Sequence, residues 1–247
     1  MLFLLLLLSH HGEARVTPPP YKLPNSSLDV IARYDKWAPD YSATHTAQYF
    51  DVAKETDFIR KSLLYAKFVS DQLNLTRPDP AEMRVLDVGC GSGLMGSIFR
   101  DLNFGQLDGF DGSEGMVNET LKTGQYDRIW QHFVSSDQPI DLDRLGGYDL
   151  VLARGVLGYL HIAPEAIFRL VEMVKPPSGL LVIAHFYEQK SPERRSWFGR
   201  SDSVLEDFAR NGSCQLLHRE IDFEYHNTFN LTGENGMGLR MILRRIL

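Results

Sequence analysis

The sequence predicts an α/β fold, in which a mostly parallel sheet carries helices on both of its faces. Between residues 83 and 185, short apolar runs typical of buried strands alternate with segments of helical periodicity. A glycine-rich turn at residues 89–93 joins the first of these strands to the first helix. A chain of 247 residues without an internal repeat is long enough to bury the core of one such domain.

The elements follow one another in a regular order through the middle and the end of the chain. Apolar and β-branched residues predict strands at Met83–Val88, Leu107–Phe110, Ile129–Val134, Leu150–Ala153 and Leu180–His185. Helical periodicity predicts helices at Leu94–Leu102, Glu114–Thr123 and Pro164–Val174. Past Ser201, a helix to about Arg210 precedes two more strands, at Gln215–Tyr225 and Leu239–Leu247. Such alternation favours a sheet of seven strands with helices on both faces.

The N-terminal part of the chain is expected to cover the sheet rather than to join it. Residues 1–24 form a leader and a proline-rich linker, and residues 25–247 form the main domain. Its first part, to about residue 80, is a helical cap. Within this cap, apolar spacing predicts one long amphipathic helix from Thr44 to Leu73, which Pro78 and Pro80 end.

The glycine turn fits two kinds of cofactor site. Gly91, Gly93 and Gly96 match the Gly-x-Gly-x-x-Gly fingerprint of dinucleotide sites, and Asp111 follows at a spacing suited to a ribose contact. Asp87 argues against a dinucleotide, because its carboxylate would repel the pyrophosphate that such a turn holds. The same charge would attract a cofactor that carries an ammonium and a sulfonium group, such as S-adenosylmethionine.

Four segments resemble the motifs of the class I S-adenosylmethionine-dependent methyltransferases, in order and at compatible spacing. They are Leu86–Gly93, Gly109–Met116, Tyr148–Ala153 and Pro176–Ile183. The resemblance implies a Rossmann-like fold with a mostly parallel seven-stranded sheet and an antiparallel C-terminal strand. It also implies that S-adenosylmethionine is the cofactor.

The resemblance assigns cofactor contacts to residues of these motifs and of the turn after the third strand. In the family, the acidic residue that ends the second strand holds the ribose hydroxyls, which implies this role for Asp111. Asp137 matches the position of a side chain that meets the adenine amino group, although it could equally form a turn before Pro139. The implied set is Asp87, Gly89, Cys90, Gly91, Gly93, Asp111, Gly112, Met116 and Asp137.

A narrower resemblance precedes the fold. The run Tyr34-Asp35-Lys36-Trp37-Ala38-Pro39-Asp40-Tyr41 resembles a signature of small methyltransferases similar to the Williams–Beuren region methyltransferase. It departs from that group at Ser42, where related sequences often have Asp. The resemblance implies that this segment covers the cofactor pocket.

Two groups of side chains are candidates for contact with the methyl acceptor. Tyr34, Trp37 and Tyr41 form an aromatic set that either lines the rim of a pocket or packs the cap on the sheet. Arg154, Tyr159 and His161 follow the fourth strand, where methyltransferase substrates usually lie. His161 could equally be a loop histidine on the surface, so the sequence assigns no general base and leaves the catalytic residues unknown.

The sequence therefore predicts a methyltransferase that acts on a small molecule. The alternatives are an NAD-dependent oxidoreductase and a non-catalytic module that binds S-adenosylmethionine. A net charge of −6 without a basic stripe disfavours a nucleic-acid substrate, and the histidines and two cysteines do not cluster as metal ligands do. No oligomeric state is indicated.

The leader leaves the compartment open between two interpretations. The apolar run Leu2–Leu8 is too short to span a bilayer, and no basic residue precedes it. A cytoplasmic protein is expected on this basis and from the absence of a disulfide framework. If Met1–Ala14 is a signal peptide, the protein is instead secreted or luminal.

Overall fold

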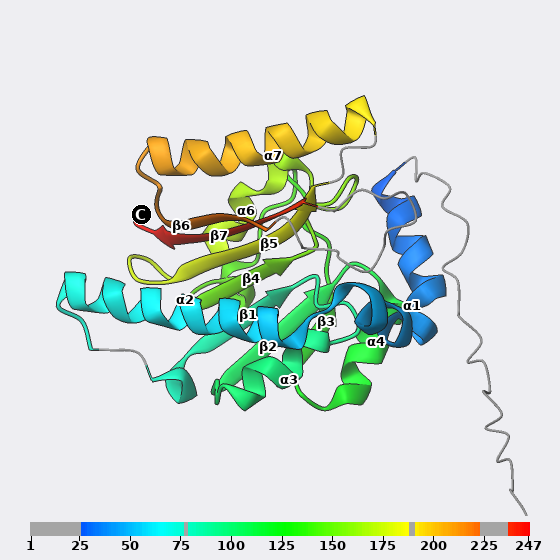
Figure 1. The fold of residues 1–247 in the computed structure, drawn as a ribbon, viewed down its shortest axis with the longest axis horizontal. Helices are drawn as coiled ribbons and strands as arrows, with labels where there is room; N and C mark the ends of the chain where they lie inside the picture. The colour runs from blue at the N-terminus through cyan, green and yellow to red at the C-terminus, as the bar shows by residue number, and fades with distance from the viewer. Residues whose placement is uncertain (1–25, 77–78, 188–190, 223–236) are drawn as a thin grey trace, which may run out of the picture.

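The computed structural model describes residues 26–76, 79–187, 191–222 and 237–247. They form one twisted sheet between layers of helices (Figure 1). The strands are β1 (Arg84–Val88), β2 (Gln106–Asp111), β3 (Arg128–Gln131), β4 (Leu150–Arg154), β5 (Leu180–Tyr187), β6 (Cys214–Asp222) and β7 (Met237–Arg245). The leader and linker predicted at residues 1–24 lie outside the described residues.

The sheet has seven strands in the order β3-β2-β1-β4-β5-β7-β6. Strands β1 to β5 pair in parallel, whereas β7 runs antiparallel between β5 and β6. This arrangement confirms the predicted fold class, including the antiparallel C-terminal strand. Because the strand order reverses direction at β1 and β4, the carboxyl ends of these two strands flank the point where open α/β sheets bind ligands.

Helices cover both faces of this sheet. They are α1 (Ser27–Tyr49), α2 (Val52–Leu73), α3 (Leu94–Asp101), α4 (Glu114–Thr123), α5 (Leu142–Leu145), α6 (Phe168–Met173) and α7 (Pro192–Arg210), with 3₁₀ turns η1 (Pro80–Glu82) and η2 (Pro164–Ala166). None of the helices in the described part of the chain is long and apolar enough to cross a membrane.

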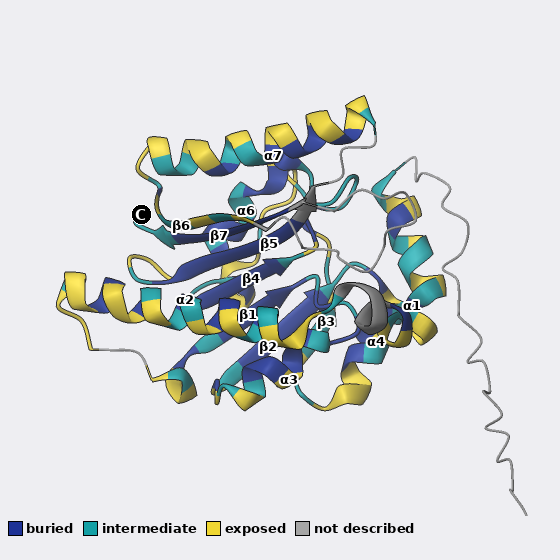
Figure 2. Ribbon diagram, viewed as in Figure 1, coloured by how far each residue is buried: buried dark blue, intermediate teal, exposed yellow. Residues whose placement is uncertain are grey.

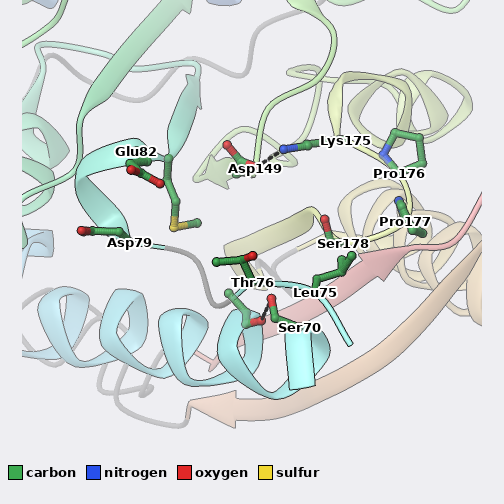
Figure 3. Close-up of a pocket in the computed structure, with 12 residues that line it drawn as sticks. Ser70, Leu75, Thr76, Asp79, Glu82, Asp149, Lys175, Pro176, Pro177 and Ser178 are labelled. Carbon is green, nitrogen blue, oxygen red and sulfur yellow. Dashed lines mark hydrogen bonds and ion pairs between the residues drawn. The ribbon is translucent and has the colours of Figure 1, made fainter. Parts of the chain in front are cut away.

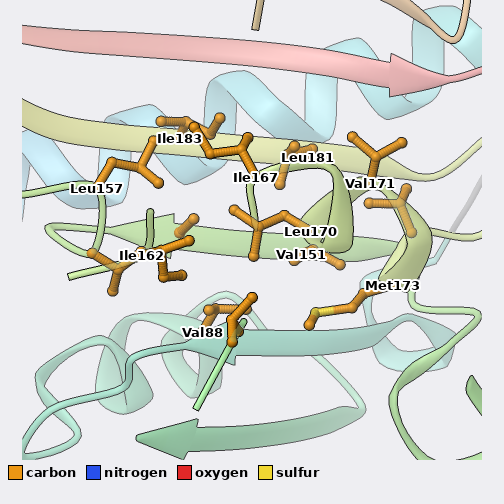
Figure 4. Close-up of a cluster of buried hydrophobic side chains, with 14 of the residues drawn as sticks. Val88, Val151, Leu157, Ile162, Ile167, Leu170, Val171, Met173, Leu181 and Ile183 are labelled. Carbon is orange, nitrogen blue, oxygen red and sulfur yellow. The ribbon is translucent and has the colours of Figure 1, made fainter. Parts of the chain in front are cut away.

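Residues that alternate along the strands divide the core into two layers (Figure 2). In β1, for example, Leu86 and Val88 face the layer that α6 and α7 complete, whereas Val85 faces α2 and α3. Figure 4 shows part of the first layer, where Ile167 and Leu170 lie against Val151 and Leu181. Burial of strand residues on both faces explains why the sequence shows continuous apolar runs instead of alternation.

The N-terminal cap differs from the single long helix predicted at Thr44–Leu73. The structure contains two helices, and the chain is extended at Phe50 between them (φ −117°, ψ 104°). Asp51 then begins α2 as its N-cap, because its carboxylate accepts a hydrogen bond of 3.1 Å from the amide of Lys54. Helix α1 starts earlier than predicted, at a Ser26 cap, and continues through Pro39. The predicted C-terminal end at Leu73 is confirmed.

Other boundaries also differ from the sequence prediction, and three of these differences are the most informative. Helix α7 begins at Pro192, not after Ser201, since Ser191 caps it and proline is accommodated in the first turn. Strand β3 ends at Gln131, before the predicted end at Val134. The helix predicted at Pro164–Val174 is a 3₁₀ turn followed by the short α6.

Candidate functional site

The turn that follows β1 is built from glycines that no other residue would replace without strain. Gly89, Gly91 and Gly93 all have positive φ, at 66°, 58° and 83°. At Gly89 a Cβ would also lie 2.2 Å from Cγ1 of Val156, which follows β4. The chain therefore passes close under the neighbouring loop, and α3 begins directly afterwards at Leu94.

The carboxylate of Asp111, at the end of β2, holds this turn from the side. Its Oδ2 accepts a hydrogen bond of 2.9 Å from the amide of Gly91, and its Oδ1 accepts one of 2.9 Å from the amide of Ser113. Burial raises the pKa of Asp111 above its ordinary value. The amide of Gly91 is thus directed at a carboxylate, whereas a dinucleotide site would direct such amides at a phosphate.

Asp87 lies beneath the turn rather than on its surface. Its side chain is on β1 and only 2% of the residue is exposed. The hydroxyl of Tyr126 donates a hydrogen bond of 2.6 Å to Asp87 Oδ2. Burial nevertheless raises the pKa of Asp87 to about 6. Desolvation destabilises the charged carboxylate by more than the hydrogen bond from Tyr126 and the charge of Arg154 stabilise it.

Two glycines leave room for the ring of Tyr126 beside Asp87. A Cβ at Gly96, in α3, would lie 2.7 Å from Cε2 of this ring, and a Cβ at Gly109, in β2, would lie 3.1 Å from it. Gly96, which the sequence offers as the third glycine of a dinucleotide fingerprint, therefore makes room for an aromatic side chain.

Helix α1 is fastened to the start of α4 by the carboxylate of Asp35. Asp35 Oδ1 accepts hydrogen bonds from Ser113 Oγ at 2.5 Å and from the amide of Gly115 at 3.0 Å. Ser113 is itself the N-cap of α4, as the sequence predicts, and accepts from the amide of Met116. A negative charge at a helix N-terminus is also favourable to the helix dipole. Asp35 thus joins two elements that lie about eighty residues apart in sequence.

A later turn of the same helix, at Tyr41 and Ser42, lies over the glycine turn. Tyr41 faces Gly91, where a Cβ would lie 3.7 Å from Cε1 of the ring. The hydroxyl of Ser42 donates a hydrogen bond of 2.8 Å to Ser92 Oγ. Figure 1 shows α1 beside α4, on the side of the molecule away from the free end of α2. This part of the cap therefore contacts the turn, and its role as a cover of the cofactor pocket stays a prediction.

The aromatic residues of the cap form one cluster with a histidine of the loop after β4. Tyr34 and Trp37 stack with ring centroids 6.1 Å apart, and Tyr41 packs edge-on against both. The hydroxyl of Tyr34 lies 3.0 Å from Nε2 of His161. Four of the six predicted substrate residues are thus brought together at the edge of the sheet that carries the glycine turn.

The side chains of the other two predicted substrate residues make different contacts. Arg154 forms an ion pair of 3.1 Å with the buried Glu55 of α2, which also binds Arg240. Tyr159 packs edge-on against Trp197 of α7. These side chains contact α2 and α7, and the carbonyl oxygen of Tyr159 meets the cluster at Nδ1 of His161. Their part in acceptor binding stays a prediction.

The remaining predicted cofactor residues differ in burial and in the contacts that they make. The side chain of Cys90 is buried against Thr120, and Met116 is buried at the start of α4. Gly112 follows Asp111 directly, and a Cβ there would meet Ile31 of α1. Asp137 is exposed and accepts from the hydroxyl of Ser135 at 2.5 Å, the contact expected of a turn residue. Its contact with adenine stays a prediction.

One described pocket, of about 470 Å³, lies at the opposite edge of the sheet (Figure 3). It is bounded by the end of α2, the start of β1 and the segment before β5. Lys175 and Asp149 form an ion pair of 3.0 Å within it. Because ligands of open α/β sheets bind at the carboxyl ends of the strands, this pocket is not the cofactor site.

Sequence reasoning missed three residues that build the site. Asp35 and Ser42 sit in or beside the Tyr34–Tyr41 run, but only the aromatic members of that run were expected to act. Tyr126 follows the αL residue Gly124, and nothing in its local sequence indicates a partner on β1. An acidic residue among aromatic ones on a partly exposed helix was the available signal for Asp35.

The fold and the site define the class of the protein. A seven-stranded sheet with an antiparallel β7, a glycine turn after β1 and a carboxylate ending β2 are the features of class I S-adenosylmethionine-dependent methyltransferases. The model of a methyltransferase domain family matches residues 61–220. The chain belongs to this family, whose cofactor is S-adenosylmethionine.

Among curated proteins, the chain is similar to human methyltransferase-like protein 27. The two are 33% identical over 153 residues, which cover 61% of this chain and 55% of that protein. It is also similar to the ribosomal protein L11 methyltransferase of Syntrophotalea carbinolica (strain DSM 2380 / NBRC 103641 / GraBd1), 31% identical over 45% of this chain and 34% of that one. The matches thus span about half and about a third of these relatives.

A solved structure shares the fold over nearly the whole chain. Magnesium protoporphyrin IX methyltransferase of Synechocystis PCC 6803, with bound S-adenosylhomocysteine, superposes with a TM-score of 0.56. It is 12% identical, and the match covers 89% of this chain and 99% of that one. At this identity the likeness establishes the architecture alone.

Proposed function

We propose that the protein transfers the methyl group of S-adenosylmethionine to a small-molecule acceptor. The observation that carries the proposal is the pair of carboxylates at the carboxyl ends of β1 and β2, around a turn of positive-φ glycines. Such a site suits a cofactor with a cationic end and two ribose hydroxyls, and it disfavours a pyrophosphate.

Different residues of this site are proposed to contact different parts of the cofactor. Each carboxylate oxygen of Asp111 accepts one hydrogen bond from a backbone amide and keeps a further lone pair, so Asp111 can also accept hydrogen bonds from the ribose hydroxyls. Gly89 and Gly91 let the main chain approach the cofactor closely. Gly112 and Met116 are further proposed cofactor contacts, and Asp137 is the proposed contact to the adenine amino group. Asp87 acts by its charge from beneath the turn, since Tyr126 lies against its carboxylate.

The cofactor supplies an activated methyl group, so the protein's main task is to align the acceptor behind the methyl carbon. Alignment and exclusion of water can account for most of the rate enhancement in such a reaction. The cover that α1 places over the glycine turn fits both tasks, because Tyr41 and Ser42 close the turn from above.

A small acceptor is favoured over a nucleic acid on grounds of charge. The chain carries a net charge of −6, and arginines such as Arg128 and Arg154 are engaged by Asp108 and Glu55. A nucleic-acid substrate would require a continuous basic surface. The named acceptors of the relatives differ, a ribosomal protein in one case and a porphyrin in another, so similarity alone selects none.

Isothermal titration calorimetry tests the cofactor. S-adenosylhomocysteine is expected to bind, whereas NAD and NADP are not. Binding of NAD alone would contradict the proposal and favour the oxidoreductase alternative. Incubation with methyl-labelled S-adenosylmethionine and a metabolite extract then tests catalysis. Binding without transfer of label to any small molecule would favour the alternative of a non-catalytic binding module.

The cytoplasm is the compartment that we propose. Both cysteines, Cys90 and Cys214, are buried as free thiols, which fits a reducing environment. Cell fractionation of the full chain and of a variant without residues 1–14 tests this assignment. A shift in mass on removal of N-linked glycans from the full chain would instead favour a secreted or luminal protein.

A further inference from the structure

Tyr34 and His161 come from segments that lie 127 residues apart, yet their polar atoms meet. The hydroxyl of Tyr34, on α1, lies 3.0 Å from Nε2 of His161, in the loop after β4. The two rings are edge-on, with centroids 5.6 Å apart. This geometry directs the phenol at the lone pair in the plane of the imidazole rather than at its face.

The second nitrogen of His161 fixes which ring nitrogen carries the proton. Nδ1 lies 3.1 Å from the carbonyl oxygen of Tyr159. A carbonyl oxygen only accepts, so Nδ1 is the donor, and Nε2 of the neutral ring is left as the acceptor for Tyr34. The imidazole is thereby oriented to receive a proton from the phenol.

The surroundings of His161 favour its neutral form. Burial lowers its pKa and outweighs the hydrogen bonds to the backbone of Tyr159 and Gly158, which raise it, and the charges of Arg33 on α1 and Arg194 on α7 add a smaller lowering effect. At pH 7 and above the imidazole is therefore uncharged and able to accept a proton.

The pair lies at the cofactor edge of the sheet and not on a remote surface. Tyr34 packs edge-on against Tyr41, with ring centroids 6.0 Å apart, and Tyr41 faces Gly91 of the turn. Strands β1 and β4 are hydrogen-bonded neighbours, so the turn and the loop of His161 leave the sheet side by side. The rings of Tyr41, Tyr34 and His161 thus form a continuous row from the glycine turn to the loop after β4.

We propose that Tyr34 and His161 form a proton relay for an acceptor that is a hydroxyl group on an aromatic ring. The inference rests on the proposed methyltransferase function. A phenolic hydroxyl is protonated at neutral pH and is a poor nucleophile until it loses its proton, so it requires a base. The half-buried rings of Trp37 and Tyr41 beside Tyr34 would stack against a planar acceptor.

The proton path balances without any further reagent. As the acceptor oxygen forms its bond to the methyl carbon, the bond from that carbon to sulfur breaks and its electron pair stays on sulfur. The proton of the acceptor passes to Oη of Tyr34, and the proton of Tyr34 passes to Nε2 of His161. The imidazolium then releases its proton to solvent. Tyr34 is the catalytic residue in this scheme, and His161 is a positioning residue that acts through it.

Nuclear magnetic resonance of the protein without cofactor tests the pair itself. Long-range ¹H–¹⁵N spectra of histidine-labelled protein at pH 7.5 should show His161 neutral with its proton on Nδ1. Tyr34→Phe should shift the Nε2 signal of His161. Tyr65→Phe is the matched control, because Tyr65 lies 3.5 Å from Nδ1 of His218 in a second tyrosine–histidine pair, on α2 and β6. A proton on Nε2, or an unchanged signal in Tyr34→Phe, would overturn the relay.

Methyl transfer to phenols of graded acidity tests its catalytic role. With labelled S-adenosylmethionine at pH 8, the unaltered protein should methylate both phenol and 4-nitrophenol. Tyr34→Phe should reduce kcat on phenol by about 100-fold or more, and on the already ionised 4-nitrophenol by less than about threefold. His161→Gln should reproduce this selective loss, and Tyr65→Phe should not.

The outcomes separate this inference from the proposed function. An equal loss on both phenols in Tyr34→Phe would make Tyr34 a packing residue and overturn the relay. If the unaltered protein binds S-adenosylhomocysteine but methylates neither phenol, the aromatic hydroxyl is the wrong acceptor class, and the methyltransferase proposal stands. Absence of S-adenosylhomocysteine binding would instead contradict the proposed function itself.

Discussion

The hydroxyl of Tyr126 donates a hydrogen bond of 2.6 Å to the carboxylate of Asp87, which is buried under the glycine turn. Burial also raises the pKa of Tyr126 well above its ordinary value, so the phenol keeps its proton and remains the donor. A single hydrogen bond does not offset the desolvation of Asp87, whose pKa is raised to about 6. A charged group kept at such a cost indicates a role in binding and not in stability.

Asp87→Asn is expected to stabilise the protein without cofactor in a pH-dependent manner. The pKa of Asp87 rises on folding from its ordinary value of 3.8 to about 6, so the folded protein binds more protons than the unfolded chain between these values. The contribution of Asp87 to stability is therefore most favourable below 3.8 and declines as pH rises through about 6. Asn removes this decline, which is worth on the order of 3 kcal/mol.

Urea unfolding of both proteins from pH 4.5 to 7.5 measures this difference. The variant should gain on the unaltered protein as the pH rises. The same variant should bind S-adenosylmethionine more weakly than the unaltered protein. Added salt should reduce this difference in affinity, because the lost attraction is electrostatic. Equal stability of the two proteins across the pH range would show that Asp87 is not buried as a charge.

Asp111→Ala is expected to weaken binding of S-adenosylhomocysteine by about tenfold or more, because a hydrogen bond to a charged group contributes about 1.5–3 kcal/mol. The structure adds a second effect. The amides of Gly91 and Ser113 lose their acceptor, so the free energy of unfolding should fall as well. Calorimetry and thermal unfolding measure the two quantities separately. A loss of stability with unchanged affinity would assign Asp111 to the turn alone.

Gly89→Ala and Gly124→Ala separate backbone strain from steric exclusion. Both glycines have positive φ, at 66° and 63°, but a Cβ at Gly89 would overlap Val156, whereas at Gly124 nothing lies within 4 Å. Gly124→Ala should therefore cost only about 1–2 kcal/mol for the backbone conformation. Gly89→Ala should cost more and should abolish binding of S-adenosylhomocysteine. Equal effects of the two substitutions on thermal unfolding would mean that the loop of Val156 can move aside without loss of stability.

Asp35→Ala is expected to loosen α1 from the start of α4. Loss of a capping carboxylate costs about 1 kcal/mol. If α1 must move for the cofactor to leave, S-adenosylhomocysteine should dissociate about fivefold faster, the kinetic equivalent of that energy. Asp40→Ala, an exposed carboxylate on the same helix, is the control. Stopped-flow dissociation rates decide, and equal rates for the two variants would remove α1 from the exit path.

The sequence was sufficient for the parts of the site that depend on local pattern. Asp111 and the glycine turn follow from short motifs, because a strand, a tight turn and a helix are all encoded within a few residues. The break between α1 and α2 was missed, since Phe50 and Asp51 continue the apolar and polar spacing of a helix until the cap forms. Strand β3 was overextended for a related reason, because apolar residues continue beyond Gln131.

Contacts between distant segments could not be foreseen from the sequence. Asp35 finds its partners about eighty residues away, and Arg154 finds Glu55 on a helix before the sheet begins. Each pairing depends on how the cap lies on the finished sheet, which no short pattern records. The role of an aromatic run is likewise decided by the neighbour that it meets, as His161 decides it for Tyr34.

The packing of the Tyr126 ring between two glycines has a consequence for how related sequences diverge. A Cβ at Gly96 or Gly109 would lie 2.7 Å or 3.1 Å from the ring of Tyr126, so a side chain gained at either glycine requires the ring to shift and disturbs its hydrogen bond to Asp87. Descendants of this chain should therefore keep all three residues or exchange them together. Substitution at one of these positions alone is expected to be rarer than a joint change.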